Sequence, residues 1–527
     1  MQFSRRKFIT GSAAGAAAGL FGASAFAAPT PSLRPLPASW DMTTDVVVCG
    51  SGIAGMSAAT AAVDNGASVL VFEKDVNYGG AAIINGGIIA LRGGTRFQRE
   101  AGEKDTPEAL YAHLTNPLNA EYRKNDPRLA KKYSEYCGGT QEWLEERGVK
   151  FMSTFTKSGQ YDSQHKESYL HIWTDNPGDS NAKPQPTGGY RCGRGIMVPL
   201  RAYCEKKGVK LFFEHKVTDV YRDADGNCVG CRVEAAGKVI NVRAKKGVIL
   251  AGGSFKNNRK MRWLVDPRLA GENIYATGYP HYDGDGSAII AGLRAGAMYE
   301  GDRGEDTAHL RRKFGTTRYN FPKGSKYGCP GIAVAGPRWG DTIFTNRDGR
   351  RFVREEDVSD LGGYNFYDMA LVQPEQKLWC VFDDRVAKKN RWDTTQPQCE
   401  EGYAFTAATI EELAKVTNQP ELPAQVERFN KFVEAGKDDE FDRPAKLLKR
   451  KIEQGPFHAV RIIIFAHNFT GGLAIDENAR VHDIEGNVIP GLYAAGETAG
   501  GLYVGNGMPR GIMPGRFAGE HAAQRKA

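Results

Sequence analysis

The 527-residue chain lacks several patterns that define other classes of protein. No run of Lys and Arg is interleaved with aromatic residues, and the net charge of +8 is spread thinly, so nucleic-acid binding is not expected. At most, this charge favours anionic substrates or an acidic protein partner. After the first 28 residues, no segment reaches the roughly 18 uninterrupted apolar residues of a membrane-spanning helix. A C-x-x-C-H motif is also missing, which excludes a c-type haem attached to this sequence.

The nine cysteines do not form a compact disulfide framework, and their odd number leaves at least one unpaired. Cys228 and Cys231 make a C-x-x-C, but Arg232 follows it. The surrounding residues 226–234 indicate a turn that enters a strand. A structural or incidental role is therefore expected, with a redox or metal role as the alternative. No other metal site is expected.

Glycine is abundant, with 63 residues that cluster in short runs between apolar segments. Glycine adopts backbone conformations closed to other residues and lets a ligand approach the main chain closely. Runs of this kind therefore indicate tight turns at a binding site rather than a flexible linker.

The first 28 residues have the pattern of a twin-arginine signal peptide. Ser4 to Thr10 follow the twin-arginine consensus, and Ala25-Phe26-Ala27 offers a cleavage site. An uncleaved membrane anchor is the alternative, although the Gly- and Ala-rich stretch ends at Pro29. This route exports folded proteins, commonly because a cofactor is loaded in the cytoplasm, so a periplasmic protein is expected.

Residues 44–73 predict one β-α-β unit that binds a dinucleotide. A buried strand over 44–49 is followed by a G-x-G-x-x-G turn, an Ala-rich helix over 56–65 and a second strand over 68–72. The turn meets a diphosphate with its backbone N–H groups and the start of the helix. Glu73 is spaced to accept hydrogen bonds from a ribose. The candidate binding residues here are Gly50, Ser51, Gly52, Ile53, Ala54, Gly55 and Glu73.

Further strands are predicted near 210–220, 227–242 and 246–253, the last running into a glycine turn. From residue 302 to 456 the character changes to a mixed helical pattern with charged loops. Dinucleotide-type signals then return to the end of the chain. The sequence therefore predicts an α/β fold: a Rossmann-like domain formed by 43–301 and 457–527, with an α+β domain inserted at 302–456.

Two more glycine-rich stretches, Tyr78–Gly87 and Gly491–Gly501, distinguish a flavin from a nicotinamide cofactor. With them, the chain resembles the FAD-binding family of soluble fumarate reductases, urocanate reductases and 3-ketosteroid dehydrogenases. The resemblance covers nearly everything after the signal peptide and includes the motifs at 277–286, 346–352, 455–457 and 470–472. It implies an FAD-binding domain capped by the inserted domain. It adds as cofactor contacts Lys74, Gly80, Ala81, Ala82, Gly86, Gly87, Val217, Ala251, Gly252, Asp285, Asn468, Glu497, Ile512 and Met513.

The same resemblance implies hydride transfer between flavin N5 and a carbon beside a polarised carbonyl or carboxylate, with a nearby acid or base. Three features of the fumarate reductase pattern are lost at four positions. Ser359 stands in place of the proton-donating Arg, Val334 and Ala335 in place of a Thr-Glu pair, and Gly507 in place of a second substrate Arg. The substrate-contacting His is retained as His467.

Four residues are therefore candidate catalytic residues: Tyr503, Arg510, Tyr364 and His467. The neutral phenol of a tyrosine can donate a proton to a neutral substrate carbonyl. Each tyrosine has a packing role as its alternative, and Arg510 has an ion pair with a carboxylate.

The sequence thus predicts an exported FAD-dependent oxidoreductase that reduces an activated C=C bond of an enone or enoate, not a simple C4-dicarboxylate. A dehydrogenase that introduces such a bond into a ketosteroid-like ketone is the alternative enzyme, and a flavin electron-transfer subunit is the alternative of another class. No convincing attachment residue indicates covalent FAD. A reductase also needs a separate c-type cytochrome or quinol-linked electron donor.

Overall fold

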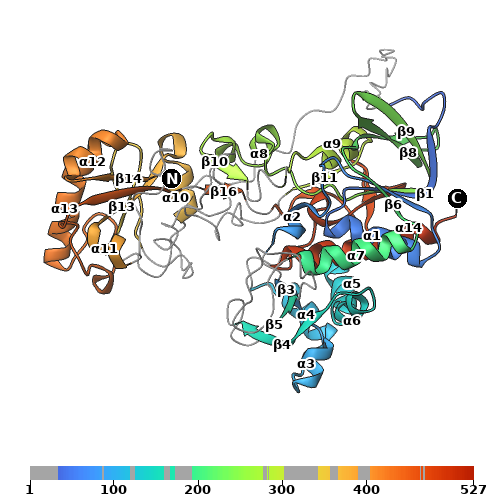
Figure 1. The fold of residues 1–527 in the computed structure, drawn as a ribbon, viewed down its shortest axis with the longest axis horizontal. Coiled ribbons are helices and arrows are strands. Elements are labelled where there is room, and N and C mark those ends of the chain that lie inside the picture. Colours follow the sequence, from blue (N-terminus) through green and yellow to red (C-terminus); the bar gives the residue numbers. More distant parts are fainter. Residues whose placement is uncertain are drawn as a thin grey trace, which may run out of the picture.

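The structure is a computed structural model of the whole chain. It describes residues 34–85, 88–118, 125–158, 167–172, 193–276, 282, 284–301, 342–355, 366–389, 404–462, 464–466 and 469–526. Two lobes stand side by side along the longest axis (Figure 1). The main lobe contains an eight-stranded sheet, and the second lobe contains a four-stranded sheet.

Five parallel strands form the centre of the main sheet, in the order β19-β9-β1-β2-β6. Their bounds are Val488–Ala494, Lys238–Leu250, Met42–Cys49, Val69–Phe72 and Lys210–Phe212. Antiparallel strands complete it: β18 (Arg480–His482) beside β19, and β7 (Lys216–Arg222) paired with β8 (Cys228–Ala235), which pairs with β9. The α/β class expected from the sequence is confirmed.

Three helices, α1 (Ile53–Asp64), α7 (Arg194–Lys206) and α14 (Gly507–Gln524), pack together on this sheet. On β7 packs α9 (Ser287–Arg294). The predicted unit β1-α1-β2 is confirmed. The three later strand predictions need correction: residues 210–220 form two strands, β6 and β7, and 227–242 divide at the Ala236–Gly237 turn. The segment beginning at 246 is the end of β9, because this strand runs unbroken from Lys238.

Short elements extend the main lobe beyond the sheet (Figure 1). A three-stranded sheet has the order β3-β5-β4, with bounds Ile88–Leu91, Glu167–Ile172 and Phe151–Ser158. The helices near it are α2 (Gly80–Ile83), α3 (Arg96–Glu100), α4 (Pro107–Leu114), α5 (Pro127–Cys137) and α6 (Thr140–Glu145).

The second lobe is an antiparallel sheet flanked by helices. Its strand order is β12-β13-β15-β14, with bounds Ile343–Thr345, Leu378–Asp383, Phe457–Ile462 and Ala404–Ala407. Its helices are α10 (Phe366–Leu371), α11 (Asp384–Lys389), α12 (Ile410–Thr417) and α13 (Leu422–Ala435). Because β15 pairs with β13 and β14, we propose that the inserted domain extends to about Ile462 rather than ending before residue 457.

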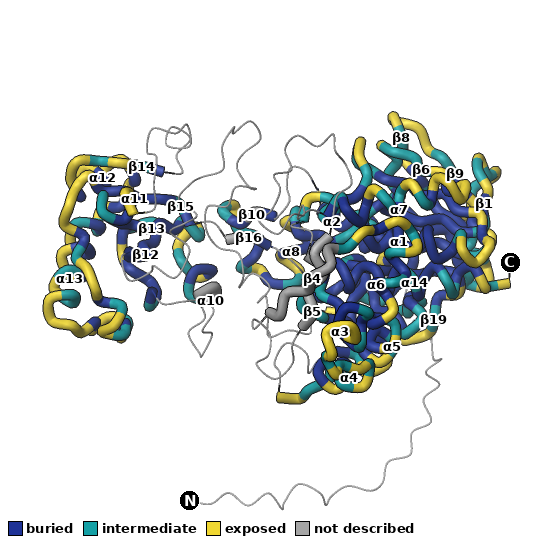
Figure 2. Tube along the Cα trace, turned by 60° about the horizontal axis from the view of Figure 1, so that its bottom comes forward, coloured by how far each residue is buried: buried dark blue, intermediate teal, exposed yellow. Residues whose placement is uncertain are grey.

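Two short strand pairs lie outside the two main sheets of the described chain. The strand β10 (Ile274–Ala276) pairs in parallel with β16 (Ile464–Ala466), and β11 (Tyr299–Glu300) pairs with β17 (Gly472–Leu473). Beside β10 lies α8 (Arg259–Val265). Buried segments concentrate inside each lobe (Figure 2). No helix among the described residues has the length and apolar character needed to cross a membrane.

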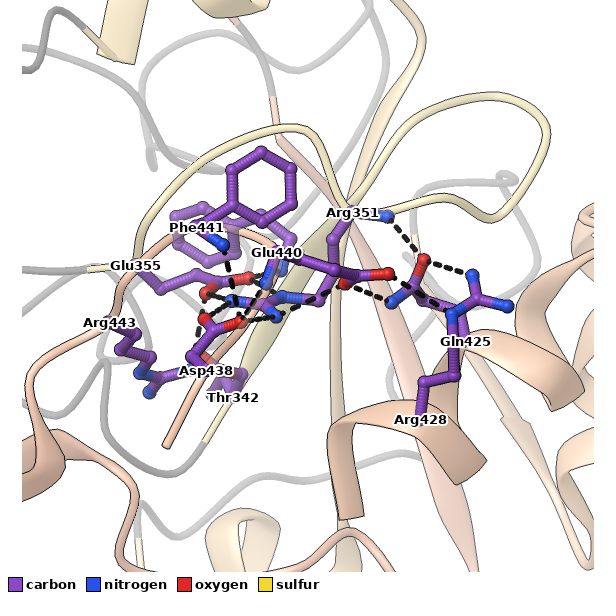
Figure 3. Close-up of polar contacts among 10 residues, drawn as sticks. Thr342, Arg351, Glu355, Gln425, Arg428, Asp438, Glu440, Phe441 and Arg443 are labelled. Carbon is purple, nitrogen blue, oxygen red and sulfur yellow. Dashed lines mark hydrogen bonds and ion pairs between the residues drawn. The ribbon is translucent and has the colours of Figure 1, made fainter. Parts of the chain in front are cut away.

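The second lobe is held by an unusual cluster of fully buried charges (Figure 3). The Arg351 guanidinium donates to Glu355 at 2.6 Å and to Asp438 at 2.8 Å, and Arg443 donates to Glu355 at 3.2 Å. All four side chains have an exposed fraction of 0%. Burial alone would lower the pKa of Arg351, but the two carboxylates raise it. The cluster thereby fixes residues 342–355 against the chain that follows α13.

Candidate functional site

Three glycines where β1 leads into α1 differ in what surrounds them. Gly50 has φ +97°, a conformation that L side chains rarely adopt, and makes the tight turn. A Cβ on Gly55 would overlap the carbonyl oxygen of Gly50, so this glycine lets α1 pack closely on the turn. A Cβ on Gly52 would meet nothing within 4 Å. The main chain is therefore open at Gly52, where α1 begins and a diphosphate is expected.

Glu73 closes the end of β2 beside this turn. Its carboxylate is buried and accepts hydrogen bonds from the backbone N–H of Ser51 at 2.8 Å and from the Ser51 hydroxyl at 2.7 Å. The Asp75 N–H donates to its other oxygen at 3.0 Å. Each carboxylate oxygen accepts more than one hydrogen bond. Glu73 thus retains acceptor capacity for a ribose while Ser51 fixes its position.

Asp285 joins two sides of the site through paired lysines. Lys74, which follows Glu73, lies 3.0 Å from one Asp285 oxygen, and Lys216 at the start of β7 lies 2.9 Å from the other. Burial alone would raise the pKa of Asp285, but Lys74, Lys216 and the Ser287 N–H lower it to about 2. This carboxylate is therefore firmly ionised. Val217, also expected at the adenine side, is buried beside Lys216 in β7.

A second glycine turn, at Gly79–Gly80, lies directly against the first. The Gly79 N–H donates to the Ser51 carbonyl at 3.1 Å, and a Cβ on Gly80 would lie 3.6 Å from the Gly52 Cα. Ala81 and Ala82 continue this turn as α2. The next two predicted contacts, Gly86 and Gly87, lie outside the described residues.

A third turn, after β9, completes the cradle. Ala251 is buried against Ala54 of α1, and Gly252 packs against Ala288 of α9. The Thr498 hydroxyl donates to the Gly253 carbonyl at 3.0 Å, which ties this turn to the Gly496–Thr498 segment that carries Glu497. Three turns far apart in sequence therefore surround one site.

Two residues that the sequence analysis missed lie between these turns. The Tyr282 hydroxyl accepts a hydrogen bond from the Ser254 N–H at 3.1 Å, and its ring lies near Gly80. The Lys256 ammonium lies 5.0 Å from the centre of that ring and 4.0 Å from a Glu497 oxygen. Both residues are buried. A local motif does not reveal them, because their positions depend on contacts between distant segments.

The start of α14 forms one wall of the same site. The Asn506 side chain caps the helix by accepting from the Met508 N–H at 3.1 Å. Gly511, Gly515 and Gly519 lie on the face that meets α1, and a Cβ at any of the three would overlap or press on α1 atoms. This spacing of four residues is visible in the sequence and is the signal that indicates a close helix contact. Ile512 and Met513, both predicted contacts, are buried in this helix.

The candidate catalytic residues are only partly brought together in the described chain. Tyr503 is buried just before α14, and its backbone exchanges two hydrogen bonds with the Asn125 side chain. The buried Arg510 guanidinium donates to the carbonyls of Phe469, Thr470 and Ala499. Tyr364, His467 and Asn468 lie outside the described residues, as do Ser359, Val334 and Ala335.

Cys228 and Cys231 are both buried on β8. Burial raises the pKa of Cys228 to about 12 and raises that of Cys231 well above its ordinary value. Buried thiols with raised pKa values are poor nucleophiles and poor metal ligands, since both roles need the thiolate. The expected structural role fits this environment.

These residues fit FAD. The open main chain at Gly52 and the start of α1 suit its diphosphate, Glu73 suits the ribose, and the turns at Gly80 and Gly252 border the same site. Glu497 and the start of α14 border the far end.

Comparisons with known proteins agree with this fit. The family model described as FAD binding domain matches residues 45–509. A fumarate reductase (cytochrome) from Shewanella frigidimarina is 30% identical, over 92% of this chain and 77% of that protein. An NADH:fumarate oxidoreductase from Klebsiella pneumoniae is also 30% identical, and the match covers 91% of this chain but only 48% of that protein.

Two solved structures show the same fold. The open conformation of a flavocytochrome c3 fumarate reductase has a TM-score of 0.69 and 25% identity, covering 92% of this chain and 79% of the other. A 3-ketosteroid dehydrogenase from Rhodococcus jostii RHA1, in complex with 4-androstene-3,17-dione, has a TM-score of 0.61 and 27% identity, covering 93% and 98%.

Proposed function

We propose, from the premise that this chain belongs to the FAD-binding domain family, that it is an exported reductase of activated C=C bonds in enones or enoates. The membership confirms FAD as the cofactor and the chain as an oxidoreductase that acts on CH–CH or C=C groups. Substrate, direction and export are the proposed part.

Bound FAD supplies the hydride donor and acceptor for this chemistry. Tyr503, close to the start of α14, is our first candidate for the group that donates the partner proton, with Tyr364 as the alternative and His467 orienting the substrate. Arg510 is better suited to positioning. Its guanidinium bonds to three backbone carbonyls and thereby holds residues 469–470 and 499 beside α14.

The observation that carries the substrate proposal is the open space at Gly507. By resemblance, this position in fumarate reductases supplies an Arg to a substrate carboxylate. Here it is the first residue of α14, and a Cβ would meet nothing within 4 Å. A second carboxylate left without a partner costs roughly 1–3 kcal/mol. A substrate with one carboxylate, or with a neutral ketone, therefore suits this site better than fumarate.

The test is turnover with a reduced viologen and a panel of enones, enoates, cinnamates and fumarate. We expect slow turnover of fumarate and faster turnover of at least one other class. Gly507→Arg should improve kcat/KM for fumarate, whereas Gly507→Met, of similar length but uncharged, should not. Fast fumarate reduction by the unmodified protein would contradict the proposal. Tyr503→Phe should slow the true substrate by about 10²–10⁴-fold, and full activity would move the proton donor to Tyr364.

A dehydrogenase acting on a ring ketone is the second candidate, favoured by the likeness to the 3-ketosteroid dehydrogenase. The two directions separate under anaerobic conditions. A reductase reoxidises its reduced flavin with an unsaturated substrate, whereas a dehydrogenase bleaches its oxidised flavin with a saturated ketone. A protein whose flavin responds to neither class would be an electron-transfer subunit.

Export by the twin-arginine route and a separate electron donor complete the proposal. The basis for export is Arg5-Arg6 and the Ala25–Ala27 site, and the basis for a separate donor is the absence of C-x-x-C-H from the sequence. Replacing Arg5 and Arg6 by Lys should leave FAD-loaded precursor in the cytoplasm. Mature protein in the periplasm at the normal level would refute this route.

A further inference from the structure

Lys256 is a buried cation inside the cofactor cradle, and neither the sequence motifs nor the proposed reaction uses it. Its side chain has an exposed fraction of 4%. It follows the Gly252–Gly253 turn, and its Cγ lies 3.0 Å from the position of a Cβ on Gly284. Burial of a lysine is costly unless the charge is compensated. The groups around Lys256 are therefore expected to compensate its charge.

The compensating carboxylate is Glu497. The two charged groups lie 4.0 Å apart, beyond a hydrogen bond but within strong Coulombic range. The Glu497 side chain has an exposed fraction of only 17%. The pair thus lies largely out of water, where solvent screens it weakly.

The surrounding contacts place this pair at the cofactor. Gly496, next to Glu497, packs against Ala54 at the start of α1, where a Cβ would come within 2.8 Å of the Ala54 Cβ. On the other side, the Tyr282 ring lies under the Lys256 ammonium and beside Gly80. The pair is therefore enclosed by the same turns that hold the diphosphate and line the rest of the site.

Other charged groups of the cradle have their own contacts. Asp285 is paired with Lys74 and Lys216, and the Glu73 carboxylate accepts from Ser51. Lys256 and Glu497 are a further pair of opposed charges, enclosed by the same turns. Reduction adds negative charge to a flavin, and a fixed cation in a poorly screened site favours that state, whereas a fixed anion opposes it.

We propose that Lys256 and Glu497 set the reduction potential of the bound FAD, with Lys256 raising it and Glu497 lowering it. The inference rests on FAD as the cofactor and not on the identity of the substrate. Failure of the proposed reaction would therefore leave it standing. Lys256 acts here as a positioning and electrostatic residue for the cofactor.

The test is an anaerobic spectroelectrochemical titration of the FAD-loaded variants at fixed pH and ionic strength. Lys256→Gln should shift the midpoint potential to a more negative value, and Glu497→Gln to a more positive one. The double variant should return towards the unmodified protein, and Lys256→Arg should remain close to it. The matched control is Lys132→Gln, because Lys132 also lies over an aromatic ring, 4.9 Å from the centre of Phe517, but on α5 outside the cradle.

A potential for Lys256→Gln equal to that of Lys132→Gln would overturn the proposal. Lys256→Gln leaves Glu497 buried without its partner, so that variant is the one most prone to lose FAD. If Lys256→Gln loses FAD, the Glu497→Gln variant provides the test. A midpoint potential of Glu497→Gln no higher than that of the unmodified protein would also overturn the proposal. Activity is not needed for any of these measurements.

Discussion

At the scale of single residues, the glycines where β1 leads into α1 separate cofactor binding from folding. Gly52 has open space where a Cβ would point, whereas a Cβ on Gly55 would overlap the Gly50 carbonyl oxygen. We expect Gly52→Ala to fold with an unchanged melting temperature in the FAD-free form and to bind FAD about tenfold or more weakly, because the methyl group occupies space next to the diphosphate. Gly55→Ala should be destabilised even without FAD.

The measurements are thermal unfolding of the FAD-free proteins and titration of FAD followed by quenching of its fluorescence. Equal FAD affinity in Gly52→Ala and the unmodified protein would show that the diphosphate does not approach this glycine.

Asp285 makes a residue-scale prediction about pH. Its pKa is lowered from 3.8 to about 2 in the folded protein, so its contribution to stability is present above pH 3.8 and is lost as the pH falls through about 2. The shift corresponds to about 2 kcal/mol. Asp285→Asn should therefore have a free energy of unfolding lower by about this amount at pH 7.

Urea unfolding of the FAD-free proteins at several pH values checks this. The difference between Asp285→Asn and the unmodified protein should shrink between about pH 4 and pH 2, because the unmodified carboxyl becomes neutral there. A difference that stays constant over this range would mean that the pairs with Lys74 and Lys216 do not stabilise the fold.

At the scale of elements, the contact between α1 and α14 determines where the cofactor meets two helix starts. Gly515 packs against the Ala54 carbonyl, and a Cβ there would overlap it. Gly515→Ala should therefore push the helices apart, cost about 1–3 kcal/mol of stability and weaken FAD binding. The control is Gly139→Ala, since a Cβ at Gly139 would meet nothing within 4 Å and its backbone is helical.

Both variants are compared by thermal unfolding with and without FAD. If Gly515→Ala matched Gly139→Ala in both measurements, the close contact of the two helices would have no part in building the site.

The elements also show what the sequence alone predicts. The unit β1-α1-β2 was predictable because its signals are local: an apolar run, a glycine turn and an Ala-rich helix. The assembly of Lys256, Tyr282 and Glu497 was not, because it depends on three turns that meet only in the folded chain. The contacts of the Arg510 guanidinium were not predictable either, because its acceptors are backbone carbonyls, which every residue has.

At the scale of the whole molecule, one hydrophobic core runs from the main lobe into the second lobe, since it contains both Val46 of β1 and Leu378 of β13. The cradle lies in the main lobe, and the second lobe has its own buried cluster around Arg351 and its own hydrophobic cluster around Phe429. Between them, the described contacts include the parallel pair of β10 and β16 and the bond from Arg461 to Asn273 at 3.1 Å. Further bonds join Gln376 to the Arg268 carbonyl and Asn273 to the Glu375 carbonyl, so a movement of one lobe relative to the other would pivot at this junction.

We therefore expect the second lobe to close towards the cradle when substrate binds. The two lobes are spread along one axis in Figure 1, and closure excludes water from a hydride transfer. Small-angle scattering of the FAD-loaded protein should show a smaller radius of gyration when a slowly reacting enone or enoate is added. FAD alone is the control, and it should leave the radius close to that of the FAD-free protein, because its cradle lies within the main lobe. A radius that stays the same with saturating ligand would mean that the lobes hold a fixed arrangement, and the substrate would then have to reach the flavin through a site that stays open to water.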